Sequence, residues 1–507
     1  MGGGGRQSPD KPPAIRRIPD FTRDVAAKYV GRGLSLLFEH FLTLLLVPLA
    51  GILLLALAHI VKAGHIQQLW SEARKTDLQL NLASFLICCL VLTCVLATWI
   101  FWRSRPVYLL DYHVHKPDES LKISSKSFLD RSSESGVFSE ESLTFQSKLL
   151  KNSGLGQETY LPAGLHKQPN DMSMASAREE AEIVMFDSVR HVLRRCNLQP
   201  KQVDILIVNC SLFNPTPSLS AMIVNHFKMK SNIVSYNLSG MGCSAGVISL
   251  SLARELLQVY PNSTVLVVST ENITQNWYCG SQRSMLVPNC LFRVGAAAVL
   301  LSNKWTDSWR AKYELAHVVR THMGASDQSY SCVFQCEDPD GRVGVSLSKQ
   351  VMAIAGLALK ANITTLAPLV LPWSEQAKFV LNLFARKVMR MRNIKAYVPN
   401  FKRAFEHFAI HTGGRAVVDE IEKQLSLTPY LTQPSRDTLH RYGNTSSSSI
   451  WYVLACIETK RGLRKGDRVW QIAFGSGFKC NSAVWRARRH IKTQHEAWTE
   501  CDQEGKV

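Results

Sequence analysis

The 507-residue sequence lacks the paired cysteine spacings of a disulfide scaffold or a zinc-binding module. Its 13 cysteines are scattered and odd in number, no two form a CxxC pair, and Cys88, Cys89 and Cys94 lie inside an apolar run. A disulfide framework is therefore excluded, and a reducing compartment is favoured.

Negative charge is scarce relative to positive charge. The chain has 40 Asp and Glu against 59 Lys and Arg, a net charge of +19. Such an excess favours nucleic acid, anionic lipid or phosphate-bearing ligands as partners. The sequence also lacks zinc-finger spacing, an RNP pattern and a basic-zipper heptad, so we expect no nucleic-acid partner.

A cleavable signal peptide is not expected either, because the first apolar run is too long and starts too late. Residues 34–61 and 80–102 are each long enough to span a bilayer, which takes ~20 predominantly apolar residues. Residues 1–33 hold seven Lys and Arg, whereas the loop 62–79 holds three. We therefore expect a transmembrane hairpin over 34–103 that leaves the basic tail and everything after it in the cytosol. A pair of buried core helices is the alternative.

The rest of the chain alternates between strand and helix patterns, which predicts an α/β fold with largely parallel sheets. A capping box at Ser176 and Glu179 predicts a helix start, and residues 119–159 are weakly patterned, as in a lid or linker. The strands are expected at 202–210, 232–238, 263–270, 407–412, 468–477 and 478–485, and the helices at 179–195, 218–227, 247–260, 352–361, 375–391, 414–425 and 446–458.

Residues 237–246, NLSGMGCSAG, place Cys243 on a turn between a strand and a helix. The positive end of a helix macrodipole lowers the pKa of a thiol placed there. Small neighbours leave room for a bulky electrophile and leave backbone N–H groups free to bind an oxyanion. The pattern indicates a nucleophile; an inert buried cysteine beside glycines chosen for tight packing is the alternative.

Two other motifs compete for the same turn. Gly240, Gly242 and Ala245 fit the dinucleotide-binding fingerprint, with Glu271 as the acidic residue after the next strand. This fit is weak because the acidic residue comes late and the unit does not begin the domain. The α/β-hydrolase elbow is excluded, since Met241 and Ala245 stand where it needs glycine.

The C-terminal part supplies two more candidate residues. His411 ends a predicted strand, before Gly413 and Gly414 open a helix, and Asn444 lies at another turn-to-helix junction. A structural histidine and a helix-capping asparagine are the alternatives for each alone. Their joint occurrence on equivalent turns, together with Cys243, favours a shared site.

These three residues suit a decarboxylating condensation of thioesters. Cys243 would attack one thioester and hold its acyl group. His411 and Asn444 would donate hydrogen bonds to a malonyl thioester as charge develops on its carbonyl oxygen. Backbone amides at Cys243 and in the turn that holds Gly475 and Gly477 would bind the tetrahedral oxyanion.

Several longer segments identify the family that the sequence resembles. The chain is similar to the plant 3-ketoacyl-CoA synthases, the condensing enzymes of very-long-chain fatty acid elongation. The resemblance covers about four-fifths of the chain and lies in RPVYLLDY (105–112), RTHMGASDQSY (320–330), GRVGVSLSK (341–349), NITTLAPLVLPWSEQ (362–376), HTGGRAVVDEIEK (411–423), YGNTSSSSIWY (442–452) and AFGSGFKCNSAVW (473–485).

The resemblance implies a thiolase-like fold with αβαβα layers and two pseudo-duplicated halves, 104–370 with the cysteine and 371–507 with the histidine and asparagine. It implies a Cys243, His411 and Asn444 triad, an acyl-CoA primer and malonyl-CoA as extender, without a cofactor or metal. A homodimer in the endoplasmic reticulum membrane is expected, with a ketoacyl reductase, a dehydratase and an enoyl reductase completing the elongase.

The family also needs further histidines for activity, which match His322, His407 and His440 here. From the sequence alone each is expected to support the site rather than react. The sequence departs from the family pattern at Ser239, where glycine is more frequent, and at Met323, where lysine is usual. Neither position belongs to the triad.

Three alternatives stay open at this point. Polyketide synthases of the same fold share the triad but lack a membrane hairpin, and a catalytically idle relative would act as a scaffold in an elongase complex. The basic stretch 385–403 is a second candidate for function, since it would bind anionic headgroups or CoA phosphates unless it is merely a solvated face. The multi-span elongases are excluded because the chain has no HxxHH cluster.

Overall fold

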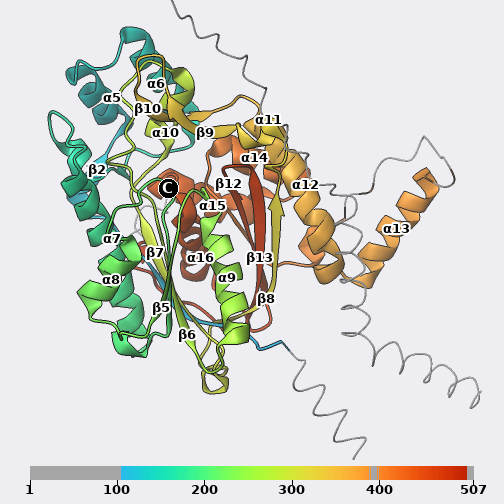
Figure 1. The fold of residues 1–507 in the computed structure, drawn as a ribbon. Coiled ribbons are helices and arrows are strands. Elements are labelled where there is room, and N and C mark those ends of the chain that lie inside the picture. The colour runs from blue at the N-terminus through green and yellow to red at the C-terminus, as the bar shows by residue number, and fades with distance from the viewer. Residues whose placement is uncertain (1–103, 388, 390–396, 398, 500–507) are drawn as a thin grey trace, which may run out of the picture. The chain divides into compact units, whose positions relative to one another are not determined.

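The computed structural model describes residues 104–387, 389, 397 and 399–499 (Figure 1). The predicted basic tail, both predicted membrane spans and part of the basic stretch 385–403 lie outside these residues. Within them, the alternation of strands and helices is confirmed.

One sheet of nine strands forms the centre of the described residues. Its order is β11 (His407–Ile410), β12 (Arg468–Gly475), β13 (Lys479–Ala487), β8 (Tyr313–His322), β1 (Tyr108–Val114), β7 (Ala296–Ser302), β6 (Thr264–Thr270), β4 (Ile205–Asn209) and β5 (Val234–Leu238). Every residue of β6 and β7 is buried, which is typical of strands covered on both faces.

The sheet is mixed, so the expectation of largely parallel sheets is wrong. Three pairs are parallel, namely β11 with β12 and β4 with both β5 and β6, whereas five pairs are antiparallel. The central strands β1, β7 and β8 lie outside the segments that the sequence assigned to strands. The connection from β6 to β7 does not cross back to the end of the sheet where β6 begins. β7 therefore runs antiparallel to β6.

Helices form layers around and within this sheet. α9 (Ala245–Val259) contacts β4 and β6 near one edge of the sheet and also β8 and β13 toward the other edge. α16 (Ser449–Lys460) contacts β1, β11 and β12. α7 (Met174–Arg195) packs on β1, β6 and β7, α8 (Leu219–Phe227) packs on β4 and β5, and α12 (Val351–Val370) packs on β8 and β13.

The remaining elements surround one end of the sheet or extend the second half. α14 (Arg415–Gln424) packs on α12, and α15 (Pro429–Tyr442) packs on β11 and α16. The others are α10 (Arg283–Leu291), α11 (Asp327–Tyr330), α13 (Trp373–Lys387), the pair β9 (Val333–Glu337) and β10 (Val343–Leu347), and the pair β2 (Lys122–Ile123) and β3 (Thr159–Tyr160). Among the described residues, α12 is long and apolar enough to cross a membrane, but here it covers the sheet.

Two local expectations need correction. The segment 119–159 contains two helices, α5 (Ser125–Glu134) and α6 (Glu140–Ser153), whose N-caps Ser124 and Ser139 each accept a hydrogen bond from the backbone three residues on. Likewise α7 begins one turn before the predicted capping box, because Ser173 accepts the Ser176 backbone N–H. Serine caps are difficult to recognise in short polar sequences, because the apolar spacing that would predict the following helix is weak there.

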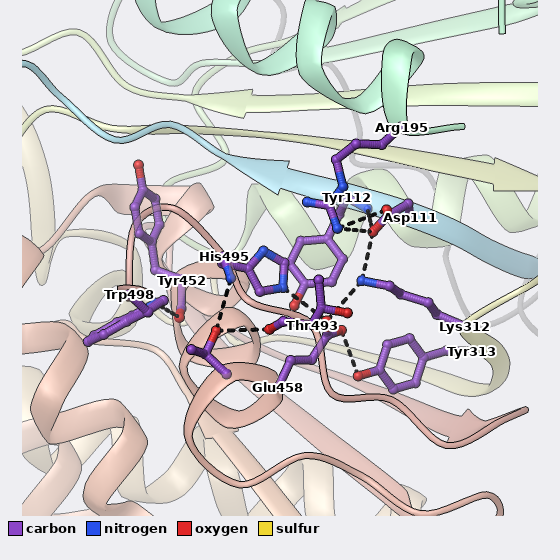
Figure 2. A network of polar contacts seen from close by, with 11 residues as sticks. Asp111, Tyr112, Arg195, Lys312, Tyr313, Tyr452, Glu458, Thr493, His495 and Trp498 are labelled. Atoms are coloured by element: carbon purple, nitrogen blue, oxygen red, sulfur yellow. Dashed lines mark hydrogen bonds and ion pairs between the residues drawn. The ribbon is translucent and has the colours of Figure 1, made fainter. Parts of the chain in front are cut away.

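A buried polar network joins residues of the N-terminal and C-terminal parts of the described chain (Figure 2). The Nζ atom of Lys312 lies 2.8 Å from Asp111 and 2.9 Å from Glu458, which also accepts a hydrogen bond from Tyr313 at 2.9 Å. His495 lies 2.9 Å from the same Glu458 carboxylate. The network thus connects β1, the start of β8, α16 and the segment after β13.

Candidate active site

A cavity of about 520 Å³ lies at the end of the sheet where β5, β11 and β12 finish. The predicted site residues Cys243, His411 and Asn444 all line it. Cys243 follows β5, His411 follows β11 directly, and Asn444 follows α15. The fold therefore brings together a thiol, an imidazole and a carboxamide that lie up to two hundred residues apart in the sequence.

Two glycines shape the turn that carries Cys243. Gly240 and Gly242 have φ values of 64° and 67°, a region that residues with a side chain rarely adopt. A Cβ on Gly242 would overlap the backbone nitrogen of Ser476, so the nucleophile turn and the 475–477 turn touch through this position. Cys243 itself is partly exposed to the cavity, two residues before α9 begins at Ala245.

Burial governs the protonation of Cys243 and His411. It raises the pKa of the Cys243 thiol to about 11, although hydrogen bonds from Ser446 and Asn444 act the other way. It lowers the pKa of the His411 imidazole to about 4. The expectation that the helix end lowers the thiol pKa is therefore wrong for the resting protein, because desolvation of the thiolate outweighs the macrodipole.

The resting site thus holds a protonated thiol and a neutral imidazole at pH 7. The Nδ1 atom of His411 is buried without a hydrogen-bond partner among the described residues. Two neutral groups therefore line the cavity, and the thiolate that nucleophilic attack requires has to be formed by loss of the thiol proton.

The backbone holds Asn444 firmly. Its N–H donates to the Leu291 carbonyl at 3.0 Å, and its own carbonyl accepts from the Arg293 N–H at 2.9 Å, so Asn444 and Phe292 form a parallel bridge. Its Oδ1 atom accepts the Ser446 N–H at 2.8 Å. The bond to Oδ1 fixes the orientation of the amide, so that its NH₂ group donates toward the Cys243 thiol.

Glu271 is a buried carboxyl that the sequence did not assign to this site. It accepts the Leu212 N–H at 2.9 Å, the Ser211 N–H at 3.1 Å and the Ser446 hydroxyl at 3.0 Å. Burial raises its pKa. These bonds connect the loop after β4 with the Asn444 loop, so the carboxyl is not free to bind a ribose hydroxyl as the dinucleotide interpretation requires.

The three further histidines separate in space. His322 lies at the end of β8, lines the cavity and accepts the Gly324 N–H at 3.0 Å on Nδ1. His407 lies at the opposite end of β11 from His411, with Nε2 3.3 Å from Asp467, and His440 is an exposed residue of α15. Neither His407 nor His440 lines the cavity.

The turn after β12 forms another wall of the cavity. Gly475 and Gly477 both line it, and a Cβ on Gly475 would overlap the Ser244 hydroxyl. Lys479, which the sequence did not single out, lines the cavity beside its strand partner His322. A group of apolar side chains from the β9–β10 region and α12 lines the far side, namely Val333, Phe334, Val345, Leu347, Val351 and Ala355.

Comparison with protein families covers both halves of the described chain. Residues 99–388 match the family described as FAE1/Type III polyketide synthase-like protein, and residues 402–487 match the C-terminal region of 3-oxoacyl-[acyl-carrier-protein] synthase III. The first match alone spans more than half of the sequence.

Curated relatives extend the similarity to nearly the full length. The chain is 54% identical to 3-ketoacyl-CoA synthase 4 of Arabidopsis thaliana over 96% of this chain and 93% of that protein. It is 53% identical to 3-ketoacyl-CoA synthase 11 of the same organism over 95% of this chain and 93% of that protein.

Solved structures show the fold. The type III polyketide synthase domain of Steely1 from Dictyostelium matches with a TM-score of 0.59 at 18% identity, over 75% of this chain and 99% of that chain. The 1,3,6,8-tetrahydroxynaphthalene synthase of Streptomyces coelicolor A3(2) matches with a TM-score of 0.57 at 19% identity, over 75% and 99%. At these identities the likeness establishes a thiolase-like, type III polyketide synthase fold for the described residues and nothing further.

Proposed function

Because the chain belongs to the plant 3-ketoacyl-CoA synthase family, we propose that it joins a long-chain acyl-CoA to malonyl-CoA by a decarboxylative Claisen condensation. The products are a 3-ketoacyl-CoA two carbons longer, CO₂ and free CoA. The observation that carries the proposal is the single cavity shared by Cys243, His411 and Asn444.

Acylation of Cys243 is the first step. The thiol proton passes to His411, the sulfur attacks the thioester carbonyl of acyl-CoA, and a tetrahedral oxyanion forms. In this proposal, backbone N–H groups at Cys243 and in the Gly475–Gly477 turn bind the oxyanion; both segments line the cavity, which supports the assignment. The carbon–sulfur bond to CoA then breaks, CoA takes the proton from His411, and the acyl group stays on Cys243.

Decarboxylation and condensation follow at the same residues. The carbon–carbon bond to the malonyl carboxylate breaks, CO₂ leaves, and the electron pair moves toward the thioester oxygen of the extender. Neutral His411 and the Asn444 amide each donate a hydrogen bond to that oxygen, and these bonds strengthen as the negative charge grows. The carbanion attacks the acyl-cysteine, the Cys243 sulfur leaves with the bonding electrons, and a proton from solvent restores the resting thiol.

The walls of the cavity suit such substrates. One side presents apolar side chains from β10 and α12, including Leu347 and Val351, which fit an acyl chain rather than a polar group. The other side presents Lys479 and His322, which offer hydrogen-bond donors to the polar part of a CoA thioester.

The setting of the enzyme is part of the same proposal. The apolar runs 34–61 and 80–102 anchor it as a two-span protein of the endoplasmic reticulum membrane, with the catalytic part in the cytosol. A homodimer of thiolase-like subunits, each with halves 104–370 and 371–507, works beside a ketoacyl reductase, a dehydratase and an enoyl reductase. The family resemblance supports these points.

The test is to incubate membranes carrying the full chain with labelled long-chain acyl-CoA and to locate the label by mass spectrometry. Label on the Cys243 peptide, lost in Cys243→Ala, supports the proposal, whereas an idle scaffold stays unlabelled. Addition of malonyl-CoA without reductant should then give a product two carbons longer. Products extended several times without reduction would indicate polyketide-type condensation instead.

A further inference from the structure

Exposed aromatic and apolar side chains gather at the end of the sheet opposite the cavity. Trp305 and Trp309, in the connection from β7 to β8, are 83% and 78% exposed. Val259 and Tyr260, where α9 ends, are 70% and 40% exposed. We call these four residues the base surface.

Hydrogen bonds place the two parts of the base surface side by side. Asn303, just before Trp305, donates through its side chain to the Tyr260 carbonyl at 2.8 Å and to the Leu257 carbonyl at 2.6 Å. Its backbone N–H donates to Ser263 in the loop after α9. The two tryptophans and the end of α9 therefore belong to one face.

The chain enters the described fold at this same face. The Arg105 N–H donates to the Gln258 side chain at 2.7 Å, one residue before Val259. Tyr108, which begins β1, pairs with Ser302, which ends β7. The predicted second membrane span ends at residue 102, so a chain anchored by that span would have only a few residues between the bilayer and Arg105.

Exposed positive charge borders the aromatic residues. Arg105 is exposed at the entry point, Arg464 and Lys465 are exposed in the loop before β12, and Arg489 and Lys492 are exposed after β13. The start of β12 and the end of β13 pair with each other, and Ala487 pairs with Tyr313 at the start of β8, so these loops lie at the same end of the sheet.

Trp373 extends the pattern. It is 86% exposed and begins α13, three residues after Val370. The Val370 carbonyl accepts a hydrogen bond from Arg468, the first residue of β12, at 3.3 Å. A third exposed tryptophan therefore lies near the same end of the sheet.

We propose that the base surface docks on the anionic headgroup layer of the membrane in which the predicted spans lie. Tryptophan and tyrosine are the side chains enriched at membrane–water interfaces, and basic side chains are attracted to anionic lipid. Contiguous exposed apolar patches mark surfaces that meet another protein or a membrane. This inference depends on the proposed membrane anchor and adds a defined orientation, with the catalytic cavity facing away from the bilayer.

The test uses the full chain reconstituted into vesicles of phosphatidylcholine with phosphatidylinositol. A photoreactive p-benzoylphenylalanine replaces Trp305 in one variant and Trp309 in another. A matched control replaces Val137, an exposed residue between α5 and α6. α6 packs on α10, which in turn packs on the cavity-lining strand β10, and Figure 1 shows these elements close together. Lipid adducts are measured by mass spectrometry, and resistance to alkaline extraction independently reports whether the chain is inserted.

We expect about tenfold more lipid adduct at positions 305 and 309 than at 137, since interfacial aromatic positions lie at headgroup level. Omitting phosphatidylinositol, or introducing Arg464→Glu with Lys465→Glu, should lower the adduct several-fold. Equal adducts at 305 and 137 in an inserted chain would overturn docking while leaving the anchor and the condensation chemistry intact. Adducts at 305 to a second copy of the chain would overturn it as well, because the face would then be a subunit interface.

Discussion

Replacing Lys312 by methionine should destabilise the protein through the charges it leaves behind. Lys312 is 3% exposed and Glu458 is fully buried, and the ammonium group lies between Glu458 and Asp111 (Figure 2). Asp111 keeps an ion pair with Arg195 at 3.0 Å, whereas Glu458 keeps only hydrogen bonds from neutral Tyr313 and His495 among the described residues. The variant therefore leaves one buried carboxylate without a positive partner.

The expected loss follows from that uncompensated charge. Removing one partner of a buried ion pair costs about 3–5 kcal/mol. With an unfolding entropy of about 2.1 cal/mol/K per residue, the roughly 400 residues from Ser104 onward convert this to a fall in Tm of about 4–6 °C. The measurement is thermal unfolding of the full chain in detergent, followed by tryptophan fluorescence, for Lys312→Met and the parent protein.

The loss should also depend on pH. Burial is the first cause that lowers the pKa of His495, and the charge of Lys312 is a further one. Lys312→Met removes the second cause, so the folded-state pKa of His495 rises in the variant. Because the variant's folded-state pKa of His495 is higher than the parent's, the variant gains stability relative to the parent when the imidazole becomes protonated. The difference in unfolding free energy should therefore narrow as pH falls below the ordinary histidine pKa of about 6.5.

The matched control is the double variant Lys312→Met with Glu458→Gln, which removes both charges and keeps the hydrogen-bonding shape. Its Tm should recover most of the loss. A double variant as unstable as Lys312→Met, or a deficit that widens at low pH, would refute the argument from an unpaired buried carboxylate.

Three further results are expected. Asn444→Ala should slow condensation about 10²–10³-fold while labelled acyl-Cys243 still accumulates, because one donor to the enolate oxygen is lost. Radiolabelled condensation product is the readout. Equal losses of acyl-Cys243 formation and of condensation would contradict the assignment. Alkylation of Cys243 by iodoacetamide, measured on its peptide by mass spectrometry, should rise with pH toward about 11, since burial holds the thiol protonated; a rate already maximal at pH 7 would disagree. Gly242→Ala should abolish acylation, because its Cβ overlaps Ser476 and its φ is 67°; Gly240→Ala, which has open space, is the control and should retain more activity.

The three cavity residues could be found from the sequence because each follows a recognisable local pattern. Cys243 lies between glycines after a strand, and His411 and Asn444 lie on turns of the same type. Cys243 and His411 each follow a strand that pairs in parallel with its neighbour, and the carboxyl ends of parallel strands are where sites gather in α/β folds. The family resemblance then linked them to one reaction.

The features that the sequence did not reveal depend on tertiary contacts. The thiol pKa follows from desolvation by the surrounding fold, which no local pattern encodes. The antiparallel strands β1, β7 and β8 pair with partners up to 200 residues away. Glu271 and Lys479 face the cavity only because distant loops meet there, and the family's His407 and His440 lie outside it.

The backbone bridge between Asn444 and Phe292 limits how the substrate specificity of the enzyme can change. The same short stretch of backbone holds Phe292, an aromatic wall of the cavity, and Asn444, whose amide we propose to donate to the reacting oxygen. A longer or bulkier acyl chain that displaces Phe292 would also displace Asn444 from its position in the cavity. Changes at Phe292 that make room for new substrates should therefore slow turnover. Changes on the β9–β10 side of the cavity should alter the accepted chain length at a smaller cost in rate.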